Sequence, residues 1–96
     1  MNNVIMVGRI AKINVDKTKN TAELTIAVTR NFKNTEGLYE TDFIPCKLWN
    51  GIFINSIEYL YEGDLVGIKG RLQLFEDKTV AVIAEKVRFL SPKSKN

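Results

Sequence analysis

The sequence contains no histidine and only one cysteine among its 96 residues. The lack of histidine excludes Ser-His and Cys-His nucleophilic catalysis, His-based acid–base catalysis and nearly every zinc arrangement. The single Cys46 excludes an intrachain disulfide and is typical of a cytosolic chain. The carboxylates Glu36, Glu40 and Asp42 are scattered without a paired spacing. We therefore expect no enzymatic activity, no metal site and no cofactor.

Long apolar runs and linkers are also lacking. No stretch reaches eighteen consecutive apolar residues, and MNNVIMVGRI at the start lacks a charged region followed by a long apolar segment. We therefore expect neither a secretory signal nor a membrane span. No Pro/Gly/Ser-rich tract divides the chain, which predicts one domain over residues 1–91 and a short disordered tail over 92–96.

Lysine and arginine exceed aspartate and glutamate by 14 to 11, so the formal net charge is +3. This is a mild bias toward anionic partners. The apolar fraction of 45% is enough for a single small core.

The spacing of apolar and turn residues predicts strands along most of the chain. Strands are expected over 4–15, 23–29, 42–49, 65–75 and 79–90, with a loop over 30–40 and a tight hairpin over 76–78. Asn50 is expected to cap a short helix that ends near Leu60. Five strands with a helix between the third and fourth predict an all-β OB-fold, a Greek-key barrel that binds oligonucleotides or oligosaccharides. Three glycines fit the bends of such a barrel: Gly8, Gly67 and Gly70.

Two predicted strands carry cations and aromatic rings opposite their core faces, because successive side chains of a strand point to opposite sides. In DFIPCKLWN (42–50), Phe43, Lys47 and Trp49 oppose a core face of Ile44, Cys46 and Leu48. In 65–75, the core parity holds Val66, Ile68, Leu72 and Leu74, and the other parity holds Lys69, Arg71, Gln73 and Phe75.

Such a surface suits single-stranded nucleic acid, in which phosphates and the faces of unpaired bases are both accessible. Each residue alone has another interpretation. Trp49 is equally well explained as an interface residue, and isolated lysines are commonly solvated charges. The occurrence of rings and cations on one face of two strands favours the binding interpretation.

Five segments of the sequence resemble the bacterial single-stranded DNA-binding protein family (SSB). They are NNVIMVGRI, LTIAVTRNF, DFIPCKLWN, EYLYEGDLVGIKGRLQ and AEKVRFL, and they cover the chain from Asn3 to Leu90. The resemblance implies an OB-fold, binding of single-stranded DNA in replication, recombination and repair, and a homo-oligomer for which a tetramer is favoured and a dimer remains open. It also implies a cytoplasmic, nucleoid-associated protein, with Val4 to Arg9 contributing to a subunit interface.

The resemblance places base-stacking aromatics at Phe32, Phe43 and Trp49. The resemblance also implies that six cations contact phosphates: Arg9, Arg30, Lys33, Lys47, Lys69 and Arg71. The family's hairpin between strands four and five is long and carries a further stacking ring, whereas here it shortens to EDK (76–78). Phe75 is our candidate for that ring.

The family also carries an acidic tip that recruits replication and repair enzymes, whereas this sequence ends in SPKSKN. We therefore do not expect recruitment through such a tip. Two alternatives stay open. One is a primosomal accessory protein of the same family line that acts mainly through protein contacts, and the other is an RNA- or tRNA-binding OB module.

Overall fold

The computed structural model describes residues 1–90, and the predicted tail over 92–96 lies outside the described residues. The chain folds into five strands with one short helix between the third and fourth, as the sequence predicts. The elements are β1 (Val4–Asp16), β2 (Thr21–Lys33), β3 (Tyr39–Trp49), α1 (Asn50–Ser56), the 3₁₀ turn η1 (Ile57–Tyr59), β4 (Leu65–Leu74) and β5 (Val80–Phe89).

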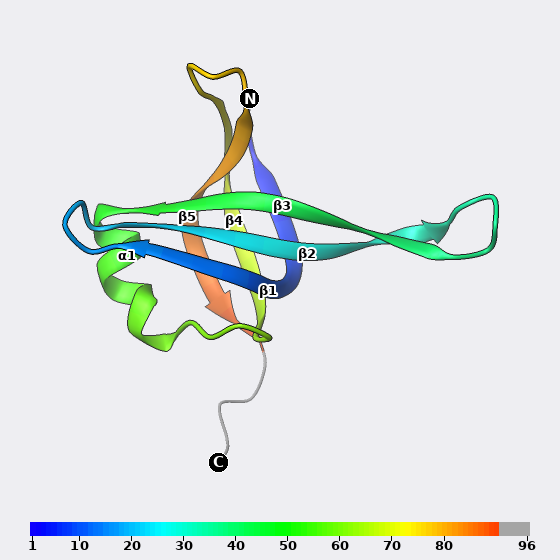
Figure 1. The fold of residues 1–96 in the computed structure, drawn as a ribbon, viewed down its shortest axis with the longest axis horizontal. Coiled ribbons are helices and arrows are strands. Elements are labelled where there is room, and N and C mark those ends of the chain that lie inside the picture. The colour runs from blue at the N-terminus through cyan, green and yellow to red at the C-terminus, as the bar shows by residue number, and fades with distance from the viewer. Residues whose placement is uncertain (91–96) are drawn as a thin grey trace, which may run out of the picture.

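The strands form a closed barrel in the order β1-β2-β3-β5-β4, with β4 pairing back to β1 (Figure 1). β1 is long enough to take part in both sheets of the barrel: residues 4–9 pair with β4 and residues 9–16 pair with β2. The closing seam between β3 and β5 is parallel and short, with the pairs Cys46↔Val82 and Lys47↔Ile83. All other strand pairs are antiparallel.

The barrel interior is filled by alternating residues of every strand. The most deeply buried side chains are Ile10, Leu24, Ile26, Cys46, Leu48, Val66, Ile68 and Val82. The α1 residue Phe53 and the following Leu60 cover one end of this core. Burial of aliphatic side chains in a single cluster is the main stabilising contribution in a domain of this size.

Gly8 and Gly70 sit where two strands approach too closely for a side chain. A Cβ at Gly8 would lie 2.4 Å from the carbonyl oxygen of Ala27, and one at Gly70 would lie 2.1 Å from that of Ile83. At Gly67 an added Cβ would make only ordinary contact with Leu90, at 3.5 Å, so close approach of the strands does not require a glycine there.

The helix differs from its prediction at both ends. Trp49 occupies the N-cap position without a side-chain cap, while Asn50 has a φ of 51° and is the first helical residue. The asparagine therefore tolerates the left-handed backbone at this corner instead of capping the helix. The α-helix ends at Ser56, and the 3₁₀ turn continues the chain to Tyr59.

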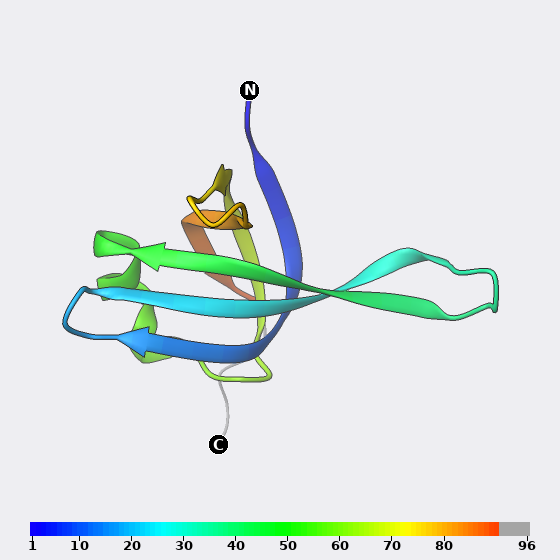
Figure 2. The same ribbon diagram turned by 45° about the horizontal axis from the view of Figure 1, so that its top comes forward.

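Two hairpins project beyond the barrel, as Figures 1 and 2 show from two directions. The β2–β3 hairpin extends through residues that were predicted to be a loop, because strand pairing continues as far as Lys33↔Tyr39. Leu72 and Leu74 keep the parity of the core face, but they lie on the projecting β4–β5 hairpin. They are therefore 47% and 62% exposed, and their assignment to the core is wrong.

No helix within residues 1–90 is long and apolar enough to cross a membrane.

Candidate nucleic-acid interface

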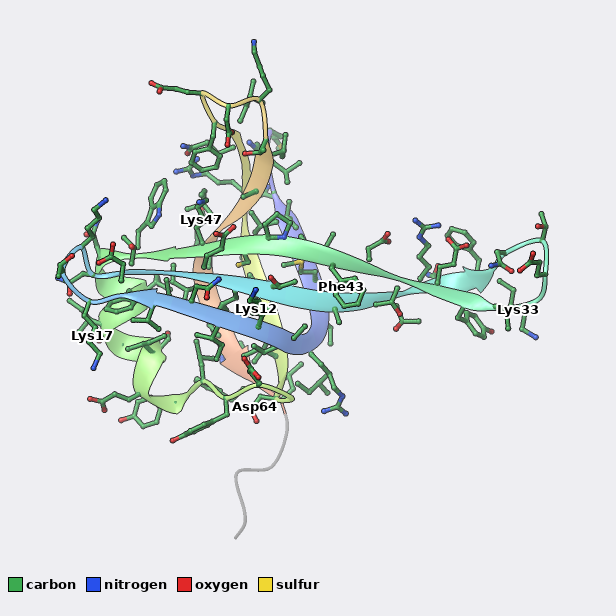
Figure 3. All side chains as sticks on the ribbon, in the orientation of Figure 1. Lys12, Lys17, Lys33, Phe43, Lys47 and Asp64 are labelled. Carbon is green, nitrogen blue, oxygen red and sulfur yellow. The ribbon has the colours of Figure 1, made fainter. Side chains whose placement is uncertain are left out.

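The outer face of β3 presents the residues that the strand alternation singled out. Phe43 lies opposite Ala27 of β2, Lys47 lies opposite Glu23, and Trp49 lies opposite Thr21. Phe43 and Lys47 both lie on the side of the barrel that faces the viewer in Figure 3. The Phe43 ring is 63% exposed, so its face is open to a ligand.

The β4–β5 hairpin brings Phe75 against this strand. The Trp49 and Phe75 rings meet edge to face with centroids 6.4 Å apart, and the Lys47 ammonium lies 4.9 Å from the Phe75 centroid. The tight turn places the ring, since the Phe75 N–H donates to the Thr79 carbonyl and the Phe75 carbonyl accepts from the Lys78 N–H. We call Phe43, Lys47, Trp49 and Phe75 the aromatic face.

Phe32 and Lys33 lie further out, on the projecting β2–β3 hairpin. The register shifts between Thr29 and Lys33, so parity cannot be carried along β2 to Phe32. The Phe32 ring is 61% exposed. The Lys33 ammonium lies 5.8 Å from the Tyr39 ring on the opposite strand, and Figure 3 shows Lys33 far from Phe43 and Lys47.

Arg30 is held by two carboxylates of β3. Its Nε and Nη2 donate to Asp42 at 3.0 and 2.9 Å, and its Nη1 donates to Glu40 at 2.6 Å. These hydrogen bonds lower the pKa of Asp42, and Asp42 raises the pKa of Arg30. Asn34 donates to the same Glu40 and accepts from two backbone N–H groups of the turn. The structure therefore places Arg30 in a network that fixes the hairpin.

The remaining predicted phosphate contacts lie apart from one another. Arg9, in the middle of β1, donates to the Gly63 carbonyl in the turn before β4. Arg71 donates to Gln73 and lies 3.8 Å from Glu85. Lys69 pairs with Ile5 of β1 and with Lys86 of β5, away from the aromatic face.

Lys69 belongs to a second surface, which we call the aliphatic face. Ile5 and Val7 of β1 are 78% and 53% exposed there, beside Leu90. They line a hollow of about 250 Å³ together with Met6, Gly67, Ile68, Lys69, Lys86 and Arg88.

The sequence reasoning missed residues of β1 and β2 that lie beside the aromatic face. Lys12 of β1 lies opposite Thr25 of β2, which in turn lies opposite Pro45 of β3, between Phe43 and Lys47 along that strand. A hollow of about 250 Å³ beside Trp49 is lined by Asn14, Val15, Asp16, Thr21, Ala22, Glu23, Lys47 and Trp49. The alternation of Lys12, Asn14 and Asp16 in the first strand was the signal available for finding it.

The only cysteine of the sequence is enclosed in the core. Burial raises the pKa of the Cys46 thiol to about 12, so the thiol stays protonated inside the core. Within residues 1–90 no three histidine, cysteine, aspartate or glutamate side chains are grouped so that they could hold a metal ion.

Residues 1–90 match the model of the single-strand binding protein family. The chain belongs to this family. Single-stranded DNA-binding protein B of Bacillus subtilis is 36% identical over 104 residues, which cover 96% of this chain and 92% of that protein. A single-stranded DNA-binding protein of Bacillus cereus is 40% identical over 106 residues, which cover 98% of this chain but 62% of that longer protein.

Solved structures of single-stranded DNA-binding proteins have the same fold. A small single-stranded DNA-binding protein from Streptomyces coelicolor superposes with a TM-score of 0.73 at 22% identity, covering 93% of this chain and 94% of that one. The protein from Thermus aquaticus gives a TM-score of 0.78 at 22% identity, covering 97% of this chain and 52% of that one. The predicted OB-fold is confirmed.

Proposed function

We propose that this chain binds single-stranded DNA without strong sequence preference, by stacking bases on the aromatic face and contacting phosphates with nearby cations. The observation that carries the proposal is the assembly of Trp49, Phe75 and Lys47 at one site from strands far apart in the sequence. Relatives that are named single-stranded DNA-binding proteins and align along almost the whole chain support it.

The chemistry of this surface selects single strands. Each ring offers a flat apolar face, and stacking of a base on a protein ring contributes about 1–3 kcal/mol. In a duplex the bases are already stacked and the rings gain little. Lys47 and Lys12 are positioned for the phosphates that connect the stacked bases. A strand that continues past Phe43 along β2–β3 would reach Phe32 and Lys33.

This binding has consequences for DNA that require no catalysis. The protein would protect exposed strands and would melt hairpins by mass action, because it binds the open form. Replication, recombination and repair all produce such strands, so we place the protein with the DNA in the bacterial cytoplasm. Affinity should fall as salt rises, since each neutralised phosphate releases counterions.

The aliphatic face is proposed to pair with a second copy of the chain. Ile5 and Val7 expose branched side chains around an apolar hollow, and such clusters usually mark protein contacts. Arrangement as a homo-oligomer would leave the aromatic face free on each copy.

The test is a fluorescence titration of Trp49, the only tryptophan, with a dT oligomer and with a duplex of equal length. We expect strong quenching by the dT oligomer, weakened by salt, and little by the duplex. Equal competition by poly-U and poly-dT would favour an RNA-binding module instead. Absence of quenching by either ligand, together with no binding by anisotropy of a labelled oligomer, would overturn the proposal.

A further inference from the structure

The hollow beside Trp49 contains two carboxylates, those of Asp16 and Glu23, together with one cation, Lys47. Glu23 of β2 lies directly opposite Lys47 of β3 and directly opposite Asn14 of β1. Trp49 is its diagonal neighbour, two positions along from Lys47. Diagonal neighbours of this kind lie about 7–8 Å apart, within reach of long side chains. Glu23 therefore faces whatever stacks on Trp49.

The Glu23 carboxylate has no side-chain or backbone partner among the described residues. Within residues 1–90 the Glu23 side chain forms no hydrogen bond or ion pair, although it lies opposite a lysine. The Lys47 ammonium lies over the Phe75 ring instead. The other carboxylate of the hollow is occupied, because Asp16 accepts from the N–H and hydroxyl of Thr18. Glu23 is thus the carboxylate of this hollow whose two oxygens both lack a hydrogen-bond partner within residues 1–90.

A carboxylate in this position cannot bind a phosphate, because like charges repel. It can accept hydrogen bonds from the edge of a base, and it has two oxygens that accept a pair of parallel donors. Guanine alone presents two adjacent donors on its Watson–Crick edge, the N1–H and the N2 amino group. Its neighbouring O6 is an acceptor that the Asn14 amide or the Lys47 ammonium can satisfy. Thymine presents one N–H between two carbonyl oxygens, which a carboxylate disfavours.

We propose that Glu23 is a specificity-determining residue that reads guanine in the hollow beside Trp49. The inference rests on the proposed function and adds a base preference at one subsite of an otherwise tolerant surface. The base stacks on Trp49, and its N1–H and N2 amino group donate to the two Glu23 oxygens.

The experiment compares three labelled oligonucleotides of equal length by fluorescence anisotropy at fixed salt. One is all dT, the second has single guanines spaced among the thymines, and the third has deoxyinosine in place of each guanine. Deoxyinosine keeps the ring, the O6 and the N1–H, and it lacks only the N2 amino group. The ratio of its Kd to that of the guanine oligomer therefore isolates one hydrogen bond from differences in stacking.

For the unmodified protein we expect a ratio of about five, in the range of a good hydrogen-bonded base contact. Glu23→Gln should bring the ratio close to one, because an amide offers a single acceptor oxygen. It should also bind the all-dT oligomer at least as tightly, because a negative charge beside the phosphates is removed. Glu58→Gln removes the same charge from the exposed η1 turn and is the matched control that should keep the ratio.

The outcomes separate this inference from the proposed function. Tight binding of all dT with a ratio near one in the unmodified protein would overturn the guanine subsite and leave the proposed function standing. A ratio that persists in Glu23→Gln would overturn the role of Glu23. Failure of the unmodified protein to bind any oligomer would overturn both. Retained all-dT binding by Glu23→Gln shows that this variant is folded.

Discussion

The aromatic face and the aliphatic face are built on the same barrel from similar cations, and they differ in the apolar side chains between those cations. The aromatic face sets Lys47 among Trp49, Phe75 and Phe43, whose flat rings match the faces of bases. The aliphatic face sets Lys69, Lys86 and Arg88 around Ile5 and Val7, whose branched side chains match other branched side chains. Positive charge is common to both faces, so we propose that the shape of the apolar groups determines the different ligand of each face.

The largest effect is expected from a charge on the aliphatic face. Val7→Asp places an unpaired carboxylate in the proposed contact between copies, and the symmetry of such a contact places it there twice. We expect association to weaken about a thousandfold, measured as a fall in mass by sedimentation or light scattering. Val80→Asp, at a valine of similar exposure on the β4–β5 hairpin, is the control and should leave the mass unchanged. An unchanged mass in Val7→Asp would reject this interface.

Removal of two rings should break the aromatic face without affecting assembly. We expect Trp49→Ala with Phe75→Ala to weaken binding of single strands about 100-fold, because two stacking contacts are lost. Anisotropy of a labelled dT oligomer measures this loss, and the mass should match that of the unmodified protein. A loss of less than about threefold would show that these rings are not stacking platforms.

A comparison of Lys47 with Arg30 sharpens the assignment of phosphate contacts. Lys47 forms no ion pair within the described residues 1–90, whereas Arg30 is neutralised by Asp42 and Glu40. We expect Lys47→Gln to reduce the slope of log K against log salt by about 0.7. Arg30→Gln should leave that slope unchanged. If Arg30→Gln reduced this slope more than Lys47→Gln does, Arg30 would be assigned as a phosphate contact.

The smallest effect concerns acid and the β2–β3 hairpin. Because Arg30 lowers the pKa of folded Asp42, the pair stabilises the hairpin above the ordinary aspartate pKa of about 4, and the stabilisation is lost as pH falls through the folded value. Asp42→Asn should loosen the hairpin at neutral pH and should flatten its response to acid. Protection of the hairpin amides from hydrogen exchange, measured from pH 7 downward, tests this. An acid response that persists in Asp42→Asn would assign it to another carboxylate.

Much of the fold followed from local pattern. Alternation along 42–49 correctly separated buried Cys46 and Leu48 from the outer Lys47 and Trp49. Turn residues gave the strand order, and that order was enough to predict the barrel. Leu72 and Leu74 show the limit, since parity identifies a face but not whether anything covers it.

The site could not be predicted fully, because it depends on how the strands pair and pack, and the pattern within one strand does not show this. Phe75 reaches Trp49 because of how the β4–β5 hairpin lies against β3, and Arg30 meets Asp42 because of the β2–β3 register. The register shift before Lys33 likewise breaks the parity that would have placed Phe32. Glu23 was overlooked because the sequence alone does not show which residues of β1 and β3 lie beside it.

The parallel seam between β3 and β5 gives the ligand a further influence on the protein. This seam is the shortest junction in the barrel, and Lys47 lies in one of its two register pairs. A DNA strand that stacks on both Trp49 and Phe75 would connect β3 with the β4–β5 hairpin, whose β5 strand forms the other side of the seam. Bound DNA would then hold β3 and the β4–β5 hairpin together across this short seam. Because a ligand that binds the folded state stabilises it, the melting temperature of the protein should rise with the concentration of single-stranded DNA.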